Sequence, residues 1–129
     1  MKRQDALYAA SCIGTIAFCV GFALPHFTGQ AVFWYLPLER AWELVEEPAG
    51  LGVDFYGRFF QGVIATAIAI ALTLVVTSRM KTERLPKTVA SLLVAWAIAL
   101  VVLTMMYYVW TLAFRVPIAV PIPDWYVPR

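Results

Sequence analysis

Charged side chains are missing from the middle of each long apolar run in this chain. A charge at bilayer depth is costly, and membrane proteins keep one there mainly for transport, proton relay or voltage sensing. The absence therefore argues against a transporter, a pump or a proton relay.

Cysteine and histidine are also scarce, with two cysteines and one histidine in 129 residues. Cys12 and Cys19 are two helical turns apart, about 10 Å along a helix axis, so they cannot form a disulfide with each other. The chain contains no CxxC, GxSxG, HExxH, P-loop or GxGxxG pattern and no basic stripe that suits nucleic acid. We therefore expect no catalytic activity of its own, no soluble substrate and no nucleic-acid partner.

What the chain has in excess is apolar residues, at 62% hydrophobic against 14% charged. A soluble domain is about half apolar and about a quarter charged. Three runs, at about residues 6–24, 59–77 and 89–114, are long enough to span a bilayer. The first exceeds the core of a typical signal peptide, about 7–15 residues, so we expect a retained anchor. The sequence predicts an all-α integral membrane protein with three transmembrane helices, as one membrane domain over residues 1–129.

The segment between the first two runs predicts an amphipathic surface helix at about residues 37–47. Pro37 suits the first turn of a helix, and Pro48 would stop the helix. Trp42 and Val45 then fall on one apolar face. We expect this face to lie on the membrane surface or against a partner subunit.

The C-terminal tail, residues 115–129, contains four prolines separated by apolar residues. Repeated proline excludes a helix and favours an extended, polyproline-like path. Trp125 and Tyr126 are the aromatic residues of this tail, and we expect them to dock on another subunit.

Basic residues predict the orientation of the chain in the membrane. Lys2, Arg3 and four further basic residues in 79–87 mark the N-terminus and the second loop as cytoplasmic. The acidic first loop and the C-terminus then face the periplasmic, extracytoplasmic side, if the membrane is a bacterial inner membrane.

Small residues form a stripe along each of the first two runs. Such stripes let helix backbones approach closely in lipid, although alanine and glycine are common in transmembrane helices in any case. The opposite face of the first run, with Cys12 and Cys19, would meet lipid or another subunit. A weaker small face, Ser91, Ala95 and Ala99, occurs in the third run. The predicted helix-interface residues are Gly14, Ala17, Gly21, Gly62, Thr66 and Ala69.

His26 is the candidate ligand for a haem, a copper ion or a quinone. Met105 and Met106 lie in the outer half of the third run, and His26 lies near the outer end of the first run. A soft His/Met copper site can therefore be drawn. A haem would favour a second strong ligand, and the chain has no second histidine. The simpler interpretation is an interfacial histidine with gap-filling methionines and no cofactor. Arg58 is expected to extend to lipid headgroups or to pair with Asp54 or with a partner's acid.

Together these features predict a non-catalytic accessory, structural or assembly subunit of a multi-subunit inner-membrane complex, of the electron-transfer or oxidase type. Its expected partners are membrane lipid and larger integral membrane subunits. One alternative is a small redox subunit that binds haem, copper or quinone near His26. Another is a small homo-oligomeric transporter or channel, against which the missing intramembrane charge argues.

Overall fold

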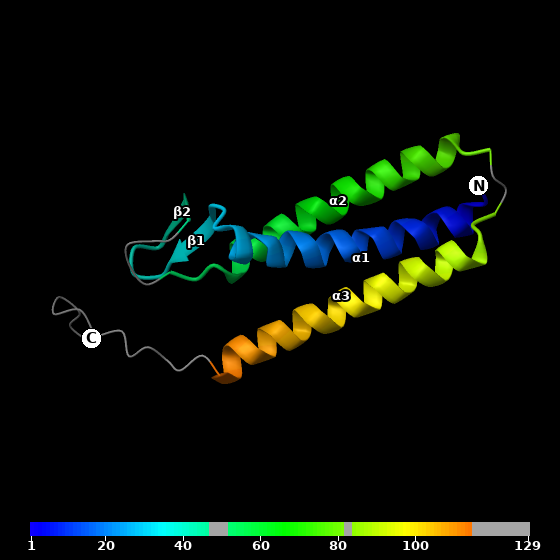
Figure 1. Ribbon diagram of the computed structural model, residues 1–129. Helices are drawn as coiled ribbons and strands as arrows, with labels where there is room; N and C mark the ends of the chain where they lie inside the picture. The colour runs from blue at the N-terminus through cyan, green and yellow to red at the C-terminus, as the bar shows by residue number, and fades with distance from the viewer. Residues whose placement is uncertain (47–51, 82–83, 115–129) are drawn as a thin grey trace.

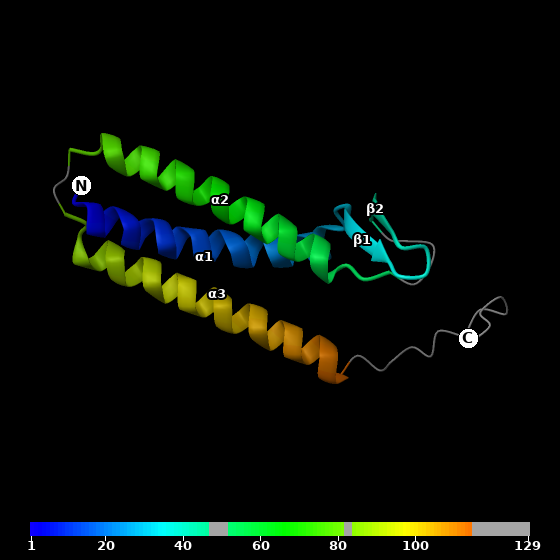
Figure 2. The ribbon, with the colours of Figure 1, turned by 180° about the vertical axis from the view of Figure 1, so that it is seen from behind.

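The computed structural model describes residues 1–46, 52–81 and 84–114. Three helices, α1 (Arg3–Thr28), α2 (Phe55–Arg79) and α3 (Lys87–Phe114), run in alternating directions, and α1 lies between the other two (Figure 1). The view from behind shows the same order (Figure 2). All three helices are long and apolar enough to cross a membrane. The chain therefore has the fold of a multi-pass helical membrane protein.

Helix α1 continues through Pro25 to Thr28, past residue 24, where the first run was expected to end. It stops instead at Gly29, whose φ of 62° is left-handed. Glycine adopts this conformation without a steric penalty and is therefore a common helix terminator. Pro25 lies within the last turn of α1. The backbone hydrogen bond that proline cannot donate is therefore lost near the end of the helix and not in its middle.

Helices α1 and α2 pack through glycines of the two predicted stripes. A Cβ atom built on Gly14 would lie 2.9 Å from the Ile70 side chain, and one on Gly21 would lie 2.9 Å from Ala65 Cβ. The Thr66 hydroxyl shares its proton between the Gly62 carbonyl oxygen of its own helix, at 2.8 Å, and the Gly14 carbonyl oxygen of α1, at 3.2 Å. A bond from a side chain to the opposite helix backbone requires this close approach, which larger residues would prevent.

Helix α3 covers the cysteine face of α1, and here our expectation was wrong. Cys12 and Cys19 are buried within the chain and do not face lipid. Cys12 lies beside Val94 and Ala97 of α3. The sequence does not reveal this contact, because α3 is apolar around its whole circumference and no pattern marks the side that packs.

The segment expected to be a surface helix is a β-hairpin, so that prediction is wrong for residues 37–46. Strands β1 (Val32–Leu36) and β2 (Ala41–Val45) pair antiparallel, with Leu36 opposite Ala41 and a turn between them. The aromatic and branched residues of β1 fit an extended, half-buried strand. A helix of about three turns is marginal on its own in water. Backbone pairing with β1 is therefore more stable for this segment than a helix.

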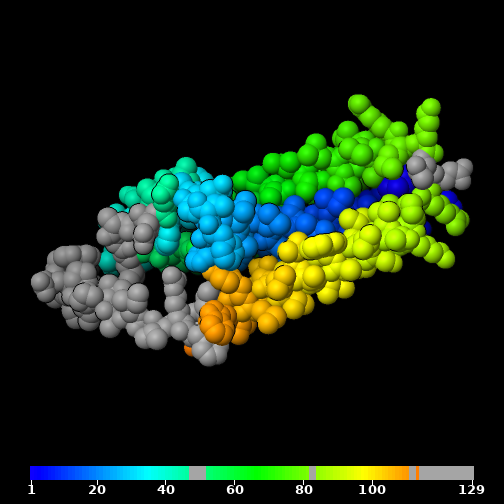
Figure 3. Space-filling model, viewed as in Figure 1, coloured from blue at the N-terminus to red at the C-terminus, as the bar shows by residue number. Residues whose placement is uncertain are grey.

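The hairpin lies beyond the ends of α1 and α2 that it connects, which we call the hairpin end of the bundle (Figure 3). Tyr35 also forms two backbone hydrogen bonds with Val53, at 3.0 and 2.9 Å, just before α2 begins. Strand β1 is thus held on both of its edges. Glu47 of the expected surface helix, and Trp125 and Tyr126 of the expected tail, lie outside the described residues.

Candidate functional site

A polar cluster forms at the hairpin end, between the last turn of α1 and the first turn of α2. Arg58 in the first turn of α2 forms an ion pair with Asp54, the residue that precedes the helix. The spacing of four residues places both side chains on one face, and a carboxylate is favourable at a helix N-terminus. Pairing with Asp54 is one of the three roles predicted for Arg58, and it is confirmed.

The same guanidinium reaches His26 of α1. Arg58 Nη2 lies 3.3 Å from His26 Nδ1. An arginine can only donate hydrogen bonds, so this contact is a hydrogen bond when Nδ1 is the acceptor and the ring proton is on Nε2. The Arg58 side chain is only 18% exposed, and its Nε atom is buried without a hydrogen-bond partner in the described part of the chain.

Two aromatic rings also contact the His26 ring. Its ring centroid lies 5.3 Å from that of Phe27 and 5.3 Å from that of Tyr107 on α3. Met105 and Met106 are instead 63% and 64% exposed on the surface of α3. The structure thus brings His26 to Arg58 and Tyr107 and leaves both methionines facing outward.

Metal-binding groups do not gather at this site. Within residues 1–46, 52–81 and 84–114, no three His, Cys, Asp or Glu side chains are grouped so that they could hold a metal ion. A quinone needs no such group, because hydrogen bonds and apolar contacts suffice to hold it, and a haem needs only one or two axial ligands.

A cavity of about 370 Å³ opens beside the polar cluster. Trp34 and Glu46 of the hairpin segment face His26, Asp54 and Arg58 across it. The Trp34 indole donates a hydrogen bond to the Val45 carbonyl oxygen at 3.0 Å and so fixes one wall. The two carboxylates outnumber the guanidinium, so an anionic group would gain little from the charges of this cavity.

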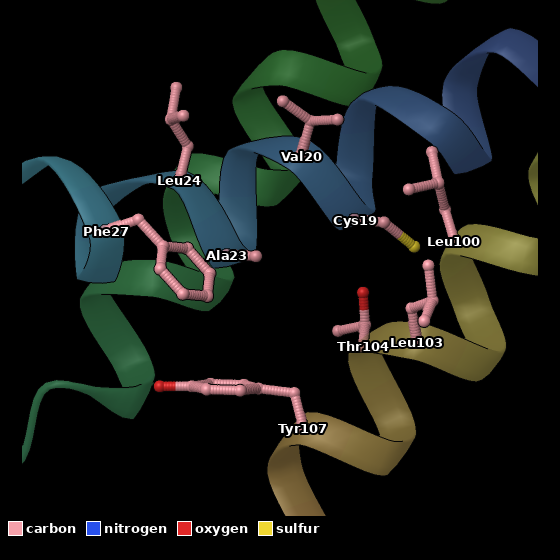
Figure 4. A pocket seen from close by; sticks show the side chains of 9 residues that line it. All are labelled: Cys19, Val20, Ala23, Leu24, Phe27, Leu100, Leu103, Thr104 and Tyr107. Carbon is pink, nitrogen blue, oxygen red and sulfur yellow. The ribbon is translucent and has the colours of Figure 1, made fainter.

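An apolar groove of about 290 Å³ runs between α1 and α3 (Figure 4). Two of its lining residues, Phe27 and Tyr107, contact the His26 ring. These two rings close one end of the groove, with centroids 5.5 Å apart. Further along, Cys19 and Thr104 face the groove from opposite sides (Figure 4). The groove can take a hydrocarbon chain or a slim apolar side chain, and its lining offers almost no polar contact.

Gly57, on which the hairpin rests, was not predicted as a functional residue from the sequence. A Cβ atom there would overlap the Phe33 carbonyl oxygen, and it would lie 2.7 Å from the Phe33 backbone nitrogen. Strand β1 therefore packs with its backbone directly on the first turn of α2. The available signal was a single glycine among large residues, in the sequence Phe55-Tyr56-Gly57-Arg58.

Trp42 and Val45, predicted to share one helical face, lie on opposite faces of β2. Side chains of a strand alternate, so residues three apart point in opposite directions. Trp42 is 55% exposed, and its ring centroid lies 5.1 Å from that of Tyr35. Val45 is half-buried on the other face, paired with Val32.

The remaining predicted interface residues lie along α1 and α2. Gly62 is buried, and a Cβ atom on it would lie 3.0 Å from the Phe18 ring, while Ala17 and Ala69 are half-buried. Comparisons of the chain with protein-family models, with curated proteins and with solved structures found no match.

Proposed function

We propose that this chain is a non-catalytic accessory or assembly subunit of a multi-subunit membrane complex, and that it binds a larger integral membrane subunit through α3. The observation that carries the proposal is the small face of α3. Ser91, Ala95 and Ala99 are all exposed, whereas Ala97, on the side that packs against α1, is only 7% exposed.

Small residues have a specific use at bilayer depth. Lipid tails solvate leucine or isoleucine at least as well as alanine, so lipid contact alone does not call for small side chains. A second helix gains van der Waals contact and short interhelical distances from them. The exposed small face of α3 therefore favours a helix of another subunit as its neighbour.

The expected parent complex is of the electron-transfer or oxidase type, in an inner membrane, with the N-terminus cytoplasmic. The polar side chains within the helix bundle favour an accessory role. Hydroxyls of the α1/α2 interface, such as those of Thr66 and Thr73, bond to backbone carbonyl oxygens and are satisfied within the chain.

Mild-detergent purification from native membranes tests the proposal. The chain should co-purify with larger membrane subunits, and Ala95→Leu with Ala99→Leu should reduce the yield of that complex severalfold. Ala67→Leu is the matched control, because Ala67 is also exposed but lies on α2. Purification of the unaltered chain alone, or full retention of partners by the double variant, would overturn the proposal.

A quinone-binding redox subunit is the second candidate, and one observation favours it. The His26 ring contacts Tyr107, which also closes the apolar groove between α1 and α3. A polar head beside an apolar groove suits a molecule with a ring and a hydrocarbon tail.

Titration of the purified chain with a short-tailed benzoquinone distinguishes the two candidates. The redox candidate requires saturable binding that His26→Phe weakens at least tenfold. Met105→Leu, on the exposed surface, serves as the matched control and should bind as the unaltered chain does. Absence of saturable binding, or equal binding by both variants, would eliminate this candidate.

A further inference from the structure

The β-hairpin has two chemically different faces. Phe33, Tyr35, Trp42 and Leu44 share one face, because the register pairs Phe33 with Leu44 and Tyr35 with Trp42. We call these four residues the aromatic face. Trp42 and Leu44 on it are 55% and 56% exposed, whereas Val32 and Leu36 on the opposite face are 3% and 6% exposed.

Short connections hold the hairpin at the ends of the spans. Three residues separate the end of α1 from Val32, and the four Cα–Cα steps from Thr28 to Val32 span at most about 14 Å. On the other side, Val53 is bonded to Tyr35 and α2 begins at Phe55. The backbone of Phe33 also rests on Gly57. The aromatic face therefore cannot move far from the level at which α1 and α2 leave the bilayer.

The aromatic face is continuous with an exposed side of α2. The Trp42 ring centroid lies 6.0 Å from that of Tyr56 in an edge-to-face arrangement. Tyr56, Phe60 and Val63 are exposed and follow one another at helical spacing down the same side of α2. This side of α2 is exposed and apolar on a helix long enough to span a membrane, so the aromatic face extends a lipid-compatible surface beyond the end of the helix.

Charges are kept off the aromatic face. Glu43 lies on the opposite face, where it is paired with Trp34. Glu39 and Arg40 lie in the turn between the strands. These three charged side chains therefore do not interrupt the exposed rings.

We propose that the aromatic face lies in the headgroup region of the lipid bilayer, and that the lipid surface itself covers it. Tryptophan and tyrosine are stable at this depth, because their rings are apolar and their polar atoms can still reach water. The hairpin is then an interfacial anchor that sets the depth and rotation of α1 and α2. This role holds with or without a partner subunit.

Spin labels on neighbouring positions of β2 test the anchor. Leu44→Cys places a label on the aromatic face, and Glu43→Cys places the matched control on the opposite face of the same strand. Both positions are exposed, so neither label disturbs packing, and the native cysteines are replaced by alanine. The full chain is reconstituted in phosphatidylcholine vesicles, and collisions with oxygen and with a water-soluble nickel chelate are measured.

The label at position 44 should collide more with oxygen, which concentrates in lipid, than with the nickel chelate. The label at position 43 should show the reverse, and Phe33→Cys should repeat the result for position 44. Equal nickel access at positions 43 and 44 would place the hairpin in water and overturn the proposal. Protection of position 44 from both reagents would show that protein covers the aromatic face, and would overturn it equally.

Discussion

At the scale of single residues, glycines set how closely the backbones of this protein approach. Gly57 is the most constrained of them, because the backbone of β1 occupies the space where a side chain would begin. Backbone atoms cannot rotate away as a flexible side chain can. Position 57 therefore tolerates no side chain without a shift of the hairpin.

Gly57→Ala should destabilise the hairpin end by about 1–3 kcal/mol, the usual cost of overpacking a filled site. Denaturant titration of the purified protein in mixed micelles, followed by circular dichroism, measures this change. Ile68→Leu at an exposed position of α2 should be near neutral. Equal stability of the two variants would contradict the close contact between Phe33 and Gly57.

Asp54→Asn should destabilise the folded protein by about 1.5–3 kcal/mol, the range for hydrogen bonds to charged groups. The substitution removes the carboxylate that pairs with Arg58, whose guanidinium is mostly buried. Glu39→Gln, in the exposed turn, should change the free energy of unfolding by less than about 0.5 kcal/mol. A cost for Asp54→Asn as small as that of Glu39→Gln would show that the ion pair contributes nothing.

At the scale of elements, the three helices could be predicted from the sequence, because each is a long apolar run and only a helix satisfies its own backbone in lipid. The hairpin could not be predicted in the same way. Trp42 and Val45 fit a helical repeat over one short segment, and β1 competes for that segment only once the chain has folded back. Pairing across a turn is a tertiary effect, which periodicity does not report.

The candidate site likewise has one part that could be predicted from the sequence and one part that could not. The pair of Asp54 and Arg58 follows from a spacing of four residues and was predicted. The approach of Tyr107 to His26 depends on the rotation of α3 about its axis, and an evenly apolar helix does not encode that rotation in a pattern. The burial of Cys12 and Cys19 was missed for the same reason.

The pairing of α1 with α2 carries a prediction of its own. Gly14→Leu should separate the two helices and cost a few kcal/mol, because its side chain would overlap Ile70. Thermal unfolding in detergent, compared with Ile68→Leu on the exposed side, gives the difference. Equal melting of both variants would place the contact between α1 and α2 elsewhere.

At the scale of the whole molecule, the basic residues predict that the N-terminus and the loop between α2 and α3 face the cytoplasm. Cysteines introduced at Lys81 and at Glu39, in a chain whose native cysteines are replaced, should react with an impermeant maleimide from opposite sides of the membrane. Labelling at Glu39 should occur in intact cells and labelling at Lys81 only after permeabilisation. Labelling of both positions from one side would contradict the three-span topology.

The central claim is that α3 binds a larger membrane subunit through its exposed small face. Photo-crosslinking in native membranes tests it most directly, with a benzophenone amino acid placed at Ala95 and, as the control, at Ala67 of α2. The account predicts an adduct of α3 with a larger membrane protein from position 95, and a much weaker one from position 67. Adducts from position 95 with lipid alone, or only with a second copy of this chain, would contradict it.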